Sequence, residues 1–163
     1  MHFDRIKNVV INEFETYGIS IENASLEPTF LCSLYGIQGR LDILELNTEN
    51  NSKIVELKSG GVPFPDDGES IKPNHTNQLY LYYQLVALVN NLKFSEIATK
   101  TDGYILYSKT PNGNLRQDKP NLRRVQSILN LRNNIIINEF TLALDDLAKT
   151  GYSGDADPSF RPY

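Results

Sequence analysis

The chain has 163 residues, of which 40% are hydrophobic and 22% are charged, as in an ordinary globular domain. Its single cysteine, Cys32, excludes an internal disulfide and any metal site built from cysteines alone. No apolar run approaches the roughly 20 residues of a membrane span. The N-terminal residues lack the pattern of a secretory signal, so we expect a cytoplasmic protein with no membrane association.

Charge is distributed unevenly along the chain. The net charge is -4, yet the segment 93–132 carries eight basic residues against three acidic ones. A basic surface attracts phosphate groups, so this segment is the candidate surface for nucleic-acid binding. An ordinary solvated surface is the alternative that charge alone leaves open. The candidate contacts are four basic residues: Arg116, Lys119, Arg123 and Arg124.

The first half of the chain predicts a helix and three strands. Apolar residues at helical spacing predict an amphipathic helix over residues 3–17, ended by Gly18. A short β-prone run follows at Thr29–Leu34. The segment Gly39–Leu46 and the apolar run Lys53–Leu57 are separated by the turn-forming residues NTENNS, which predicts a hairpin.

The second half begins with a long loop, Gly60–Pro73, which contains three prolines, three glycines and the acidic stretch PDDGE. A helix to about Asn91 follows this loop. A strand is predicted over residues 103–108, then a PNGN turn, and a long helix runs from about Leu122 to Leu147. Loops longer than about 12 residues are usually functional or mobile, so the long loop is a candidate gate for a site nearby.

The order of these elements is helix, three strands, helix, strand, helix. It predicts an α/β fold with a central mixed β-sheet flanked by helices. At this length one domain is expected, over residues 1–150, followed by a C-terminal tail over residues 151–163.

Two carboxylates and a lysine are predicted to meet on the hairpin. Glu56 and Lys58 are two residues apart on one strand and therefore share a face. Asp42, on the neighbouring strand, can face the same place. Two carboxylates form an oxygen site suited to Mg²⁺ or Mn²⁺, with the backbone carbonyl of Leu57 as a further candidate ligand. Lys58 adds a positive charge that can orient a water or neutralise charge on phosphorus.

The alternative for Glu56 and Lys58 is an exposed strand edge with alternating charges. Ile54, Val55 and Leu57 argue against it, because they predict a buried strand, on which charged side chains need a partner or a metal.

Two helices supply further candidates. Gln78 and Tyr82 are four apart and share a helix face, which can offer an amide and a phenol to a nucleotide or to the attacking water. Simple packing of the tyrosines, and an exposed position for His75 nearby, are the alternatives. Glu13 falls inside the apolar face of the first helix, and His2 falls on the same side. Either is a candidate metal ligand, with a hydrogen-bonded or rim position as the alternative.

Three motifs in order, GIQGRLD, IVELKSG and HTNQLYLY, resemble motifs II, III and Q-x-x-x-Y of the RecB-like branch of the PD-(D/E)xK nuclease superfamily. They are most similar to the nuclease domain of the DNA-replication ATP-dependent helicase–nucleases. The later segments GYILYS and LNLRNN extend the resemblance over about Glu27 to Asn138. It implies a restriction-endonuclease-like core in which Asp42 and Glu56 bind metal, and Lys58, Gln78 and Tyr82 serve catalysis.

The resemblance implies a nuclease that depends on Mg²⁺ or Mn²⁺ and cleaves single-stranded or end-frayed DNA in replication or repair. We expect a stand-alone enzyme or a piece of a helicase–nuclease, whose helicase domain or subunit lies outside this chain. Many relatives hold an iron–sulfur cluster with four cysteines, and Cys32 alone cannot form one within this chain. The alternatives are a non-catalytic module that binds nucleic acid or a partner, and a small-molecule phosphohydrolase, which the basic segment disfavours.

Overall fold

The computed structural model describes residues 2–47 and 51–149. The chain divides into two compact units, residues 1–128 and 129–163. The first unit holds the sheet and the shorter helices, and the second holds most of the last helix. The predicted domain limit at residue 150 and the predicted tail over 151–163 lie outside the described residues. Within these residues, no helix is long and apolar enough to cross a membrane.

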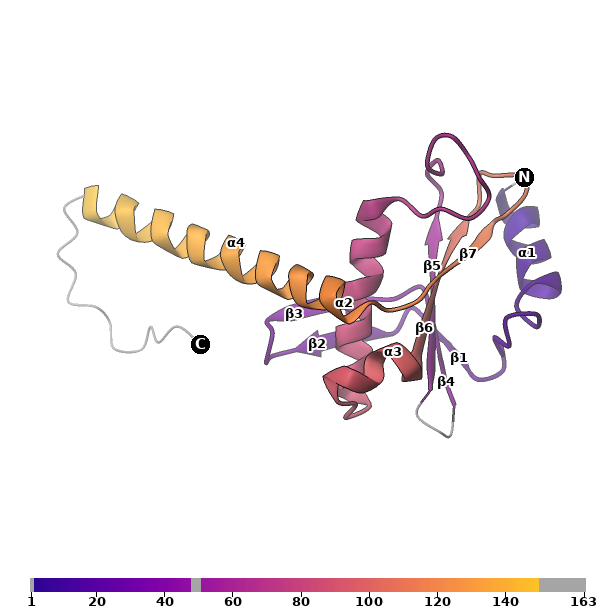
Figure 1. Ribbon diagram of the computed structural model, residues 1–163, viewed down its shortest axis with the longest axis horizontal. Helices are drawn as coiled ribbons and strands as arrows, with labels where there is room; N and C mark the ends of the chain where they lie inside the picture. The colour runs from indigo at the N-terminus through magenta and orange to yellow at the C-terminus, as the bar shows by residue number, and fades with distance from the viewer. Residues whose placement is uncertain (1, 48–50, 150–163) are drawn as a thin grey trace. The chain divides into compact units, whose positions relative to one another are not determined.

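A five-stranded mixed sheet forms the centre of the first unit, with helices on both sides (Figure 1). This confirms the predicted α/β class. The strand order is β1-β4-β5-β6-β7, and β2 and β3 form a separate two-stranded sheet. The elements are α1 (His2–Asn12), β1 (Ala24–Leu26), β2 (Thr29–Cys32), β3 (Ile37–Arg40), β4 (Ile43–Leu46), β5 (Ser52–Lys58), α2 (Pro73–Val89), η1 (Phe94–Glu96), α3 (Ile97–Lys100), β6 (Thr101–Tyr107), β7 (Leu115–Asp118) and α4 (Leu122–Lys149).

The predicted hairpin is confirmed as the antiparallel pair β4–β5, in which Ile43 lies opposite Val55 and Leu46 opposite Ser52. β5 then pairs in parallel with β6, with Lys58 beside Tyr107. Parallel neighbours need a crossover connection, and α2 lies in it. The carboxyl ends of β5 and β6 therefore lie side by side.

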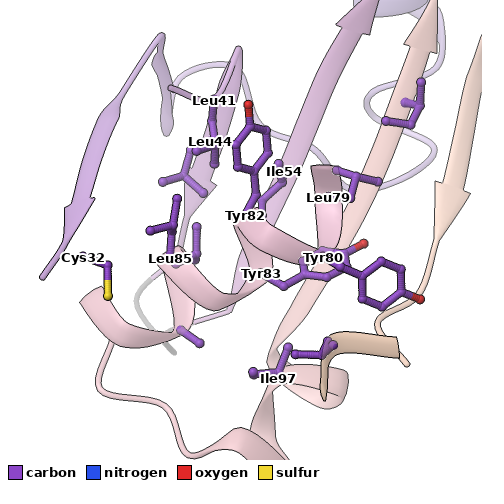
Figure 2. Close-up of a cluster of buried hydrophobic side chains, with 14 of the residues drawn as sticks. Cys32, Leu41, Leu44, Ile54, Leu79, Tyr80, Tyr82, Tyr83, Leu85 and Ile97 are labelled. Carbon is purple, nitrogen blue, oxygen red and sulfur yellow. The ribbon is translucent and has the colours of Figure 1, made fainter. Parts of the chain in front are cut away.

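Two apolar cores cover the two faces of the sheet. On one face, Leu41, Leu44 and Ile54 pack against buried side chains of α2 (Figure 2). On the other, Val9 of α1 and Phe14 pack against strand residues. α2 is apolar around most of its circumference, as expected of a helix covered by the sheet on one side and by other segments elsewhere.

Glycines set how closely α2 approaches the sheet. A Cβ at Gly103 would lie 2.7 Å from Tyr83 Cζ, so the tyrosine ring occupies the place of a side chain on β6. A Cβ at Gly39 would lie 3.0 Å from Tyr82 Cε1. These positions exclude side chains so that two helix tyrosines can lie against the strands.

Several elements differ from the prediction: Gly39–Leu46 is divided between β3 and β4, and β1, η1, α3 and β7 were not predicted. The first helix ends at Asn12, not at 17, because turns over residues 13–18 bring both Phe14 and Ile19 into the core. β7 was not predicted, because its sequence, LRQD, has a single apolar residue and no alternation to detect. It pairs antiparallel with β6, which supplies the ladder that its own sequence does not predict.

Candidate active site

Asp42 lies at a corner between two strands, and not within a strand as predicted. β1–β2 and β3–β4 form one two-stranded ribbon, which bends there. Leu41 N–H donates to the Pro28 carbonyl (3.1 Å), and Glu27 N–H donates to the Asp42 carbonyl (2.9 Å). Pro28 has no N–H, so a regular ladder cannot continue through it. The corner separates β3 from β4, which begins only at Ile43, and the Asp42 side chain lies beside β5.

The Asp42 carboxylate occupies the position of the missing ladder partner. Its Oδ2 accepts a hydrogen bond of 2.7 Å from the Leu57 backbone N–H. The N–H and C=O of one residue on an antiparallel strand point to the same neighbour. The Leu57 carbonyl, the third predicted metal ligand, therefore faces the side of the strand where Asp42 lies.

Glu56 and Lys58 share a face of β5, as their spacing predicts. Lys58 Nζ lies 2.8 Å from Glu56 Oε1. The same ammonium donates to Gln78 Oε1 at 2.7 Å. Gln78 comes from α2, so the sheet face that carries the two charges is the one that this helix covers.

Gln78 and Tyr82 join the strand residues through a hydrogen-bond network. Gln78 Nε2 donates to Glu56 Oε1 (2.8 Å) and to the Tyr82 hydroxyl (2.6 Å). The Tyr82 hydroxyl donates to the Arg40 carbonyl at 2.9 Å, just before the corner that holds Asp42. The helix face predicted from the i, i+4 spacing therefore reaches both charged strands.

Glu56 is 4% exposed, and its second carboxylate oxygen, Oε2, has no hydrogen-bond partner. Burial raises the pKa of Glu56 above the usual 4.5, and the Asp42 charge raises it further, whereas Lys58 and the Asp42 backbone N–H lower it. Ile43 lies opposite Val55, so the adjacent residues Asp42 and Glu56 also face each other across the two strands. Among residues 2–47 and 51–149, no third histidine, cysteine or acidic side chain joins them in a group that could hold a metal ion.

Two histidines lie around the carboxyl ends of β5 and β6. His75 Nδ1 is 2.9 Å from the Tyr107 hydroxyl, and burial lowers the pKa of His75, as do the charges of Lys58 and Lys72. His2 Nδ1 is 2.9 Å from Ser108 Oγ. The Ser108 N–H donates to the Lys58 carbonyl at 3.0 Å. Both histidines therefore flank the end of the strand that carries Lys58.

Tyr107, Ser108 and Arg40 were not among the predicted site residues. Tyr107 ends β6 and Ser108 follows it, and the adjacency of parallel strand ends could have pointed to both. Arg40 precedes the Leu41–Asp42 corner, and its guanidinium pairs with Glu27 at 3.4 Å while both side chains stay mostly exposed. As an exposed cation two residues before Asp42, Arg40 is a candidate contact for a ligand phosphate.

Glu13 is not brought to the carboxylate pair. It follows α1, where the backbone N–H of Leu115 on β7 lies against its carboxylate. Burial raises the pKa of Glu13, and this N–H partly offsets the rise. β6 separates β7 from β5. The structure thus favours the predicted alternative, a hydrogen-bonded position, over a metal ligand.

Of the four predicted nucleic-acid contacts, the prediction for Arg116 is wrong. Its side chain is fully buried and pairs with Asp66 at 2.7 Å, because β7 turns it inward against the long loop. Lys119, Arg123 and Arg124 are exposed. Arg124 lines a surface pocket with Thr76, near the start of α2. These three remain candidates for an exposed basic surface.

Comparison with known proteins assigns this chain to no family. No protein-family model matches it, and no curated protein matches it. Its function must therefore be inferred from the side chains that the fold brings together.

Proposed function

We propose that the protein is a divalent-metal-dependent nuclease of the RecB-like PD-(D/E)xK type, which hydrolyses phosphodiester bonds in single-stranded or end-frayed DNA. The observation that carries the proposal is the buried, unpartnered Oε2 of Glu56 beside Asp42 and Lys58. A buried carboxylate oxygen is unfavourable unless a ligand satisfies it. A divalent cation is the ligand that suits two adjacent carboxylates.

The donor set fits Mg²⁺ or Mn²⁺. Glu56 Oε2, the Asp42 carboxylate and the Leu57 carbonyl would supply protein oxygens. Mg²⁺ usually keeps several waters and binds through one or two carboxylates plus phosphate oxygens, so a third acidic ligand is not required. When bound, the cation would polarise the phosphoryl group and lower the pKa of a water.

The remaining residues position charge and substrate. Lys58 is held between Glu56 and Gln78, so its ammonium has a defined place from which to orient a water or stabilise negative charge at phosphorus. Tyr82 holds Gln78 and the Arg40 backbone together. It thereby links the spacing of α2 to the corner that carries Asp42.

The order of elements supports the restriction-endonuclease-like part of the proposal. β1–β2 and β3–β4 are the two bent arms of one ribbon, since β1 pairs with β4 and β2 pairs with β3. With each arm taken as one strand, the order is α1, three strands, α2 and β6, which corresponds to αβββαβ. β7 is then an addition at the edge, and α4 follows it.

A second candidate is a non-catalytic module that uses the same fold to hold nucleic acid or a partner. The observation that favours it is the small acidic set, two carboxylates with Lys58 already paired to one of them. Exposed Lys119, Arg123 and Arg124 suit both functions, because backbone phosphates attract them in either case. Cleavage, and not binding, therefore separates the two.

The test is cleavage of end-labelled single-stranded DNA with Mn²⁺, Mg²⁺ or EDTA. We expect metal-dependent cleavage, which Lys58→Ala reduces on the order of 10²-fold or more while its melting temperature stays within a few degrees. Lys53→Ala is the matched control. Lys53 also lies on β5 and pairs with a buried glutamate, but its partner is Glu45 of β4, at 3.9 Å. DNA binding without cleavage under every metal condition would favour the non-catalytic module.

A further inference from the structure

A pocket of about 250 Å³ lies on the face of the sheet that α1 covers. Val55 and Leu106 line it from the sheet, and Val10 lines it from α1. Two carboxylate residues, Glu27 and Asp42, also border it. The pocket is therefore aliphatic in its walls and acidic at the ribbon corner.

The pocket adjoins the candidate active site through two shared residues. Asp42 and Leu57 line it, and the Leu57 N–H binds the Asp42 carboxylate. Successive strand side chains point to opposite faces. The Leu57 side chain therefore turns towards the pocket, while Glu56 and Lys58 turn towards α2. A ligand group in the pocket would therefore lie beside Asp42.

The rim of the pocket carries uncovered apolar surface. Leu26 is 73% exposed and Leu57 is 38% exposed. The volume is below the roughly 300 Å³ at which pockets for drug-sized ligands begin, so it suits one planar ring system better than a whole nucleotide. Aliphatic walls can cover the two faces of a base, and burial of that apolar surface favours its entry.

We propose that this pocket receives one unpaired nucleobase of the DNA strand, next to the phosphodiester bond that is cleaved. The inference rests on the proposed nuclease function and adds a substrate requirement to it. A base paired in a duplex cannot enter without leaving its stack, so the pocket selects single-stranded or frayed DNA. The Glu27 carboxylate at its edge accepts hydrogen bonds, which favours bases with an exocyclic amino group over thymine.

The first experiment uses single-stranded oligonucleotides in which one abasic residue replaces a base at successive positions, with Mn²⁺. In the wild-type protein, cleavage of the bond adjoining the abasic residue should be on the order of tenfold slower than at an intact site, because apolar burial is lost. An equal cleavage rate with and without the base would contradict base binding in the pocket but would leave the proposed nuclease activity standing. No cleavage of any DNA would overturn both.

The second experiment fills the pocket. Val10→Phe should lower cleavage at intact sites to the abasic rate and erase the difference between the two substrates. Ile11→Phe is the control, because Ile11 lies on the same helix but is 59% exposed and outside the pocket. It should keep the wild-type difference. A folded Val10→Phe protein that still distinguishes the substrates would place the base elsewhere.

A binding measurement keeps the inference testable if Val10→Phe fails to fold. Lys58→Ala, with Ca²⁺ to prevent cleavage, is titrated against DNA that contains one 2-aminopurine. Its fluorescence should change on binding only at the position where an abasic residue slows the wild-type enzyme. An equal change at every position would show that no single base enters the pocket.

Discussion

Two buried charges in this molecule have opposite surroundings. The Arg116 side chain is fully buried, and each of its nitrogens has a partner. Its Nε donates to the Gly113 carbonyl (2.9 Å), Nη1 to the Ser70 carbonyl (2.5 Å) and Nη2 to Asp66 (2.7 Å). Its guanidinium carbon lies 5.1 Å from the centre of the Tyr107 ring.

Glu56 is almost as buried, yet its side-chain hydrogen bonds fall on only one of its two carboxylate oxygens. Oε1 accepts from Lys58 and from Gln78, whereas Oε2 is buried and lies within hydrogen-bond geometry of no donor among the described residues. A buried charge with every atom satisfied is what a structural clamp requires. A buried charge with one atom left over is typical of a ligand site. The comparison separates the residue that holds the long loop from the residue that we assign to chemistry.

The largest expected effect is on cleavage, from Glu56→Gln. This change keeps the side-chain volume and removes the charge that would bind the cation. Cleavage should fall on the order of 10³-fold. The free energy of unfolding in metal-free buffer should be unchanged or higher, because burial makes the folded protein favour the neutral form of this side chain. A Glu56→Gln variant that is unstable but cleaves normally when folded would assign Glu56 a structural role, like that of Arg116, and no role in cleavage.

The next largest effect is on stability, from Arg116→Met. It leaves Asp66 without its cation and removes three partly buried hydrogen bonds, so urea denaturation should show a loss of roughly 3 kcal/mol. Lys119→Met, on the exposed surface, should change the free energy of unfolding by about 0.5 kcal/mol or less. Equal losses in the two variants would mean that the Arg116 cluster contributes nothing particular.

A smaller effect distinguishes two neighbouring tyrosines. Tyr82→Phe removes the hydroxyl bonded to the Arg40 carbonyl, and Tyr83→Phe removes the one bonded to the Asp118 carbonyl at 2.6 Å. Each should cost about 1 kcal/mol of stability. Only Tyr82→Phe should also slow cleavage, by about tenfold, because Tyr82 positions Gln78 and does not itself contact the reacting groups. Equal cleavage rates would remove Tyr82 from the site.

The smallest effect is the pH dependence of stability in metal-free buffer. Burial raises the pKa of Glu56 in the folded protein above 4.5, its usual value. Its stabilising contribution is therefore present at low pH and is lost as the pH rises through that folded pKa. Denaturation of wild type and Glu56→Gln at several pH values should give a difference that changes only in that window. Parallel curves would contradict the raised pKa.

Part of the site follows directly from sequence spacing. The parity of Glu56 and Lys58 and the four-residue spacing of Gln78 and Tyr82 are local, and the structure has both pairs in hydrogen-bond contact. β4 and β5 are also antiparallel neighbours, as the hairpin prediction expected. Periodicity is sufficient here because each pair lies within one regular element.

The remaining features depend on long-range contacts. Asp42 leaves its strand because the ribbon bends against Pro28, fourteen positions earlier in the chain. Arg116 looked like a surface cation, and only the pairing of β7 with β6 and the return of the loop to Asp66 bury it. Neither contact has a signature in the local sequence.

The close packing of Tyr83 on Gly103 has a consequence for how this protein can vary. Any side chain at position 103 would press on that ring and move α2 outward, and Gln78 would move with it. The spacing between Gln78 and Glu56 is therefore coupled to a backbone position on another strand. A substitution at position 103 would contact neither DNA nor metal, yet it could change the distance between Gln78 and Glu56. It would thereby change the position of Lys58, which binds both side chains.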